Sequence, residues 1–71
     1  MHGKLRQLRE AKGMAQGDVA QYLGESRTAV THWESGKKRP DLVNLVKLAV
    51  LYNVSVAYLM GRTDNPAPVT A

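Results

Sequence analysis

A turn signal at Gly24 decides how residues 16–36 can fold. Glycine adopts a positive φ without steric cost, so Gly24 suits the position just past the end of a helix. Ser26 follows two residues later, and its hydroxyl can accept a hydrogen bond from a free amide of a second helix. Ala20 lies in the first helix and is small enough to let the second helix cross closely. Residues 16–36 therefore predict two short helices that meet at a steep angle.

The second of these helices has an apolar side and a polar side. Val30 and Trp33 lie three residues apart and are expected to pack against the first helix in the core. Side chains that can hydrogen-bond a base edge or a phosphate occupy the polar side, at Arg27, Thr28, Thr31 and His32. Two helices joined in this way form a helix-turn-helix, whose second helix reads a DNA major groove. The alternative is a helical hairpin with a solvated polar side. Such a hairpin would not require small, apolar and turn residues at the particular spacings that are found here. The residues at the expected offsets are Gln16, Ala20, Gly24, Val30 and Trp33.

The positive charge is concentrated in the part of the chain that contains this motif. The net charge of the 71 residues is +4 with neutral histidines. Residues 1–39 contain eight Lys and Arg residues against four Asp and Glu, whereas residues 40–71 contain two of each kind. A one-sided basic surface is typical of proteins that bind polyanions. The charge distribution therefore favours double-stranded DNA as the partner over a merely solvated basic surface.

The composition argues against several other classes of protein. The chain contains no cysteine, which excludes disulfides and thiolate metal sites, and its two histidines have no partner at zinc-ligand spacing. We expect no metal, no other cofactor and no small-molecule substrate. No apolar run approaches the roughly 20 residues that span a bilayer, so we expect a cytoplasmic protein with no membrane contact. We also expect that the chain is not an enzyme, because it has no catalytic groups at useful spacing and no glycine-rich phosphate-binding loop.

The residues before the motif also have the apolar spacing of a helix. Leu5, Leu8 and Ala11 are spaced as an inward-facing stripe and predict a first helix over residues 4–12. The start of the second helix has a weaker signal. Ala15 occupies its N-cap position and offers no side-chain acceptor, where Ser or Thr would supply one.

Two more helices are predicted after the motif. Asp41 can cap a fourth helix that ends near residue 52, and Ser55 can cap a short fifth helix that Gly61 ends. The fourth helix is predicted to have a broad apolar face, made of Leu42, Leu45, Val46, Leu48, Ala49 and Tyr52. The folded domain is therefore expected to cover residues 1–61. Residues 62–71 contain two prolines and no periodicity and are predicted to form a flexible tail.

The five predicted helices, with the motif in the second and third, resemble the phage-repressor family of Cro and CI-type (Xre-type) DNA-binding domains. The most specific stretches are residues 8–13, 30–36 and 48–55. The resemblance implies an all-α, lambda-repressor-like bundle of five helices. It also implies a bacterial or phage-encoded, nucleoid-associated transcriptional regulator. Such a regulator represses by binding a palindromic operator as a homodimer, which forms in solution or only on DNA.

The resemblance and the positions along the chain together assign roles to individual residues. The residues expected to contact bases are Arg27, Thr28, Thr31 and His32. The residues expected to contact phosphates are Gln16, Ser26, Ser35, Lys37, Lys38 and Arg39. Arg9 and Glu34 match a family ion pair between the first and third helices. The alternatives are a phosphate contact or a solvated side chain for Arg27, and a surface position without a role for His32.

Two other functions fit the same fold. The chain can be the antitoxin of a toxin–antitoxin pair, for which a protein-binding surface matters as much as DNA, or it can be the DNA-binding half of a longer regulator. A co-purifying second chain, or the intact mass of the native protein, distinguishes these cases. If two copies pair, the region of the fifth helix is expected to supply the surface. Val56 and Tyr58 are its candidates for incomplete burial, although the core is the favoured place for Tyr58.

Overall fold

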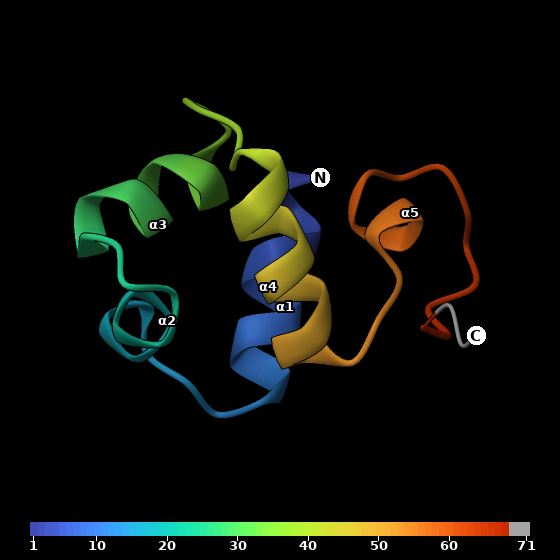
Figure 1. The fold of residues 1–71 in the computed structure, drawn as a ribbon, viewed down its shortest axis with the longest axis horizontal. Helices are drawn as coiled ribbons and strands as arrows, with labels where there is room; N and C mark the ends of the chain where they lie inside the picture. The colour runs from blue at the N-terminus through green and yellow to red at the C-terminus, as the bar shows by residue number, and fades with distance from the viewer. Residues whose placement is uncertain (69–71) are drawn as a thin grey trace.

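The computed structural model describes residues 1–68 and contains five α-helices in that range, with no β-strand among them. The helices are α1 (His2–Ala11), α2 (Gln16–Leu23), α3 (Arg27–Ser35), α4 (Leu42–Tyr52) and α5 (Val56–Leu59). In Figure 1, α2 and α3 lie on one side of α1 and α4, and α5 lies on the other side with the segment that follows it. Within residues 1–68, no helix has both the length and the apolar character needed to cross a membrane. The prediction of an all-α bundle of five helices is confirmed.

The observed helix ends differ from the predicted ones mainly in α1. This helix begins two residues before the predicted start, because the N–H of Leu5 already donates to the carbonyl of Met1 at 3.2 Å. It ends at Ala11, one residue earlier than predicted, and Lys12 serves as its C-cap. α3 ends at Ser35, and Gly36 is its C-cap with φ 83.

The structure confirms the predicted helix caps and the predicted turn at Gly24. Ser26, Asp41 and Ser55 each accept a hydrogen bond from the third amide of the helix that follows, at 3.1, 2.8 and 2.9 Å respectively. Gly24 has φ 72 and ends α2 in the left-handed region, and Asn53 has φ 54 at the end of α4. These contacts satisfy amides and carbonyls that a helix end leaves without a partner. They fix the angles at which α3, α4 and α5 leave the preceding turns.

The start of α2 is capped from one side only. The carboxylate of Asp18 accepts a hydrogen bond from the N–H of Ala15 at 2.8 Å. A full capping box would also have a side-chain oxygen at the N-cap that accepts from the Asp18 amide. The methyl group of Ala15 cannot supply that oxygen. The weak N-cap predicted from the sequence is thus half compensated by Asp18.

An Ala15→Ser substitution is expected to complete this capping box. Ala15 already has the extended backbone of an N-cap, with φ −81 and ψ 161, so the serine hydroxyl can reach the Asp18 amide without rearrangement. We expect a gain of about 1 kcal/mol in the free energy of unfolding, measured by chemical denaturation. Ala11→Ser, at an exposed position at the end of α1, is the matched control and should not stabilise the protein. Equal unfolding midpoints for wild type and Ala15→Ser would contradict the prediction.

One hydrophobic core connects the five helices. Its buried members are Leu5, Val19, Ala20, Leu23, Val30, Trp33, Leu45, Leu48, Ala49, Tyr52, Val54 and Leu59. Trp33 therefore packs in the interior, as its spacing with Val30 predicted. Burial raises the pKa of Tyr52 to about 12, because the ionised phenolate would lose its hydration. The packing of α2 against α3 places the polar side of α3 on the outside of the molecule.

The prediction that Ala11 faces inward is wrong, and part of the predicted apolar face of α4 is exposed. Ala11 is exposed, because α1 ends there and only Leu5 and Leu8 of its stripe pack against the rest of the bundle. On α4, Leu42 and Val46 are 71% and 46% exposed. The apolar arc of α4 is wider than the surface that the other helices cover, since Asn44, rather than Leu42, is buried at its start. The side-chain nitrogen of Asn44 donates to a Glu25 carboxylate oxygen at 3.1 Å, which satisfies this buried amide.

The segment after α5 folds back toward the start of that helix. The N–H of Ser55 donates to the carbonyl of Pro66 at 3.1 Å. A further bond joins the N–H of Arg62 to the carbonyl of Ala57 at 2.9 Å. The flexible tail predicted for residues 62–71 stays a prediction, and its residues 69–71 lie outside the described part of the chain.

Candidate nucleic-acid interface

The four residues predicted to contact bases lie along the outer side of α3. Arg27, Thr28 and Thr31 are exposed, and His32 is half-buried. Arg27 and Thr28 form the first turn of the helix, directly after the Ser26 cap. The side chains at the N-terminal end of α3 are therefore open to a partner.

A partly buried ion pair holds α3 against α1. The Nε and Nη2 atoms of Arg9 donate to the two carboxylate oxygens of Glu34, at 2.7 and 3.0 Å. The side chains of Arg9 and Glu34 are only 12% and 6% exposed. The third donor of Arg9, Nη1, bonds the carbonyl of Met14 at 2.8 Å and so also fixes the loop before α2. The hydrogen bond to Glu34 raises the pKa of Arg9 above its ordinary value, so the guanidinium stays charged.

Gln16 joins this pair to the outer side of α3. Its side-chain nitrogen donates to Glu34 at 3.2 Å, and its side-chain oxygen accepts from the Thr31 hydroxyl at 2.8 Å. These two bonds fix which end of the amide is the donor. An amide nitrogen carries two hydrogens, so the Gln16 side chain has a second one to offer to an outside acceptor.

The contacts of Thr31 give it a role that the sequence did not suggest. Its hydroxyl lies 2.8 Å from the Gln16 side-chain oxygen and 3.1 Å from the carbonyl of Arg27. A hydroxyl has one proton, and the shorter of the two contacts favours the Gln16 oxygen as its acceptor. Thr31 therefore braces Gln16. Gln16 and Thr31 are 15 residues apart, so neither helical spacing nor a local motif reveals this pair.

The basic loop after α3 has a fixed backbone and exposed side chains. The carbonyl of His32 accepts from both the Ser35 hydroxyl, at 3.1 Å, and the Lys38 amide, at 3.2 Å. Gly36 has φ 83, where a residue with a side chain is strained, and a Cβ there would lie 3.0 Å from the His2 ring, so the position favours glycine. Exposed cations follow it directly, at Lys37, Lys38 and Arg39. The loop thus presents its positive charges from a rigid backbone.

A shallow polar cavity of about 320 Å³ lies where α1, α2 and α3 meet. Its lining residues are Arg6, Arg9, Gln16, Thr31, Glu34 and Ser35. Gln16 and Ser35 were predicted as phosphate contacts, and this cavity brings them together with Thr31. Arg6 was missed by the sequence reasoning. Its position three residues before Arg9, on the same side of one helix, is the signal that could have indicated it.

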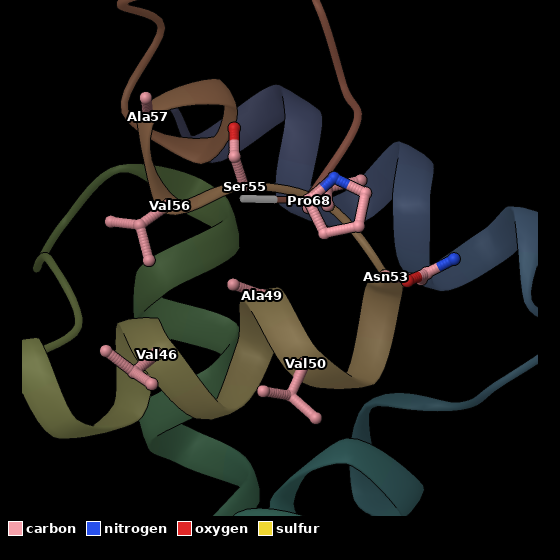
Figure 2. A pocket seen from close by; sticks show the side chains of 9 residues that line it. Val46, Ala49, Val50, Asn53, Ser55, Val56, Ala57 and Pro68 are labelled. Atoms are coloured by element: carbon pink, nitrogen blue, oxygen red, sulfur yellow. The ribbon is translucent and has the colours of Figure 1, made fainter. Parts of the chain in front are cut away.

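A second, apolar groove of about 370 Å³ lies between α4, α5 and the segment after α5. Figure 2 shows Val46 and Val50 of α4 on one side of it, with Val56 of α5 and Pro68 on the other. Val50 is 68% exposed although it is a large apolar residue. Val56 is half-buried, as predicted, and Tyr58 is also half-buried against the core, so the full burial favoured for Tyr58 is wrong. An exposed apolar surface of this kind commonly marks a protein–protein contact.

Two helices that pack through a left-handed glycine turn, with an open polar side on the second helix and a basic loop after it, define a helix-turn-helix domain. A family model described as helix-turn-helix matches residues 5–59. The chain belongs to this helix-turn-helix family, and its relatives identify the Cro/CI-type (Xre-type) group that the sequence resembled.

The chain is similar to several transcriptional regulators. It is 42% identical over 65 residues to the uncharacterized HTH-type transcriptional regulator YobD of Bacillus subtilis, a match that covers 92% of this chain and 58% of that protein. It is 36% identical over 59 residues to the cryptic phage CTXphi transcriptional repressor RstR of Vibrio cholerae, covering 83% of this chain and 53% of that protein. The chain thus spans little more than half the length of these relatives.

Two solved structures share the fold. The P22 c2 repressor, determined in complex with a synthetic operator, has a TM-score of 0.82 at 24% identity, covering 87% of this chain and 94% of that one. The restriction-modification controller protein C.AhdI from Aeromonas hydrophila has a TM-score of 0.74 at 36% identity, covering 82% and 88%. The five-helix architecture predicted from the sequence is therefore that of known helix-turn-helix proteins.

Proposed function

We propose that this chain is the DNA-binding domain of a transcriptional repressor and that α3 enters the major groove of double-stranded DNA with its N-terminal end first. The observation that carries the proposal is the exposure of Arg27 and Thr28 on a helix whose inner side is fixed by the Arg9–Glu34 pair. The repressor and regulator names of the relatives support the same function. The open polar side of α3 needs no rearrangement to meet a duplex.

The side chains of α3 have the chemistry to read bases. Arg27 can donate two hydrogen bonds to O6 and N7 of a guanine, and Thr28 can place its methyl group against a thymine methyl. His32 can donate to an acceptor such as guanine N7. For Thr31 we propose contact through its methyl group or its hydroxyl oxygen, because its proton bonds within the protein.

A second group of residues is proposed to bind the DNA backbone on either side of the bases. Its members are Gln16, Ser26, Ser35, Lys37, Lys38 and Arg39. Gln16 stands at the first position of α2, where free amides and the helix dipole also favour an anion. Such contacts hold the protein in register and make the affinity fall steeply with salt.

Selection of binding sites from random duplex DNA at low salt tests the proposal. We expect enrichment of one short sequence, with a guanine at the position read by Arg27. Enrichment of no sequence, together with equal weak affinity for all duplexes, would contradict sequence-specific binding. An intact mass of the native protein well above that of this chain would show that the domain is part of a longer regulator.

We further propose that two copies bind a palindromic operator and pair through the apolar surface of α4 and α5. The surface combines the exposed Val46 and Val50 with the groove beside Val56. A two-fold interface places the same patch of each copy in contact, and an apolar patch can pack against a second copy of itself. Pairing would place two copies of α3 about 34 Å apart, one turn of DNA.

Val50→Gln is expected to weaken this pairing without unfolding the domain, because Val50 is 68% exposed in the single chain. Burial of a valine is worth roughly 1.5 kcal/mol or more, and the substitution acts on both copies. The preference for a two-half-site duplex over a single half-site should fall by about tenfold or more. Val43→Gln, at a 64% exposed valine of the same helix outside the groove, is the matched control. Equal loss in both variants, or in neither, would contradict the proposed surface.

A further inference from the structure

Of the two arginines that line the polar cavity, Arg6 has the longer and more exposed ion pair within the protein. It lines the cavity between α1, α2 and α3, and it forms an ion pair with Glu10, one helical turn away. The Arg6 Nε lies 3.6 Å from a Glu10 carboxylate oxygen, and the two side chains are 65% and 55% exposed. An exposed pair of this length contributes little to folding, so Arg6 can exchange its partner at little cost.

The other charges at the cavity are already matched. Arg9 uses its donors on the two oxygens of Glu34 and on the carbonyl of Met14. Glu34 is neutralised by this bidentate contact and also accepts from Gln16. When Arg6 is not paired with Glu10, the lining residues therefore carry one uncompensated positive charge, that of Arg6.

The start of α2 supplies neutral donors beside the same cavity. Gln16 lines it and is the first residue of α2, so its backbone N–H has no acceptor one turn earlier in the helix. The Gln16 side chain adds its second amide hydrogen. A cavity with one exposed guanidinium and the N–H donors of Gln16 suits a phosphate group.

We infer that this cavity holds a phosphate of the DNA backbone and that Arg6 binds it after leaving Glu10. Glu10 keeps Arg6 beside the cavity while no DNA is bound and competes with the phosphate for the guanidinium. The inference rests on the proposed function, because it names a further contact of the same interface. It assigns roles to two residues that lie outside the helix-turn-helix itself.

The affinity for a selected duplex, measured over a range of salt concentrations, tests the role of Arg6. In Arg6→Gln, we expect Kd to rise several-fold and the slope of log K against log salt to become smaller by about 0.9, as for one lost phosphate contact. Arg62→Gln removes the same charge from an exposed arginine after α5 and is the control for net charge. An Arg6→Gln slope equal to that of wild type or Arg62→Gln overturns the inference.

Glu10→Gln tests the competition. We expect it to lower Kd several-fold in the wild-type background but to change Kd by less than about twofold in the Arg6→Gln background. The same tightening in both backgrounds would show a general charge effect and overturn the role of Glu10. If wild type binds no duplex at low salt, the proposed function fails and the inference fails with it. If wild type binds and only the Arg6→Gln result is negative, the proposed function stands and the inference alone is overturned.

Discussion

Glu34→Ala is expected to lower the free energy of unfolding by about 3 kcal/mol, the largest loss for any single change at the interface. The substitution leaves the guanidinium of Arg9 partly buried and without its carboxylate, at a side chain that is 12% exposed. It also removes the acceptor of the Gln16 side-chain amide. One residue therefore supports both the stability of the domain and the geometry of the proposed phosphate contact.

Chemical denaturation of Glu34→Ala and of Glu10→Ala distinguishes the loss of a buried ion pair from the loss of a charge alone. Both variants lose a glutamate that pairs with an arginine, but the Arg6–Glu10 pair is exposed and lies within one helix. We expect Glu10→Ala to change stability by no more than about 0.5 kcal/mol. Similar small losses in the two variants would contradict the structural role given to the Arg9–Glu34 pair.

Arg27→Ala is expected to weaken binding to the selected operator by about 1–3 kcal/mol and to relax specificity at one base pair. The physical reason is that a bidentate contact to guanine discriminates against the other bases, whereas a phosphate contact does not. Binding to a panel of duplexes that differ at single positions measures the effect.

Lys37→Ala is the matched comparison for Arg27→Ala, because it also removes one exposed positive charge. We expect it to weaken all duplexes alike and to reduce the salt slope by about one. A uniform loss of the same size in both variants would contradict the proposed division between base-reading and phosphate-binding residues.

The local features of the fold could be predicted because each has a local cause. The left-handed turn at Gly24 and the caps at Ser26, Asp41 and Ser55 depend on the chemistry of one residue and the amides next to it. Trp33 could be placed in the core because helical spacing fixes which side of α3 it occupies. These features were sufficient to indicate the helix-turn-helix.

The features that depend on distant elements could not be predicted. Spacing shows that Val46 belongs to an apolar side of α4, but not that the bundle leaves it uncovered. The bond from Thr31 to Gln16 and the place of Arg6 beside α2 require the packing of three helices. The ion pair of Arg9 with Glu34 was expected only because of the family resemblance.

The backbone amide shifts of the protein during titration with its selected duplex test the central claim most directly. If α3 enters the major groove, the amides of residues 27–32 and of the loop at residues 37–39 should shift most. The amides around Val50, on the groove between α4 and α5, should respond to pairing of two copies on a full operator but not to a single half-site. Large shifts confined to α4 and α5, with residues 27–32 unchanged on every duplex, would contradict the account.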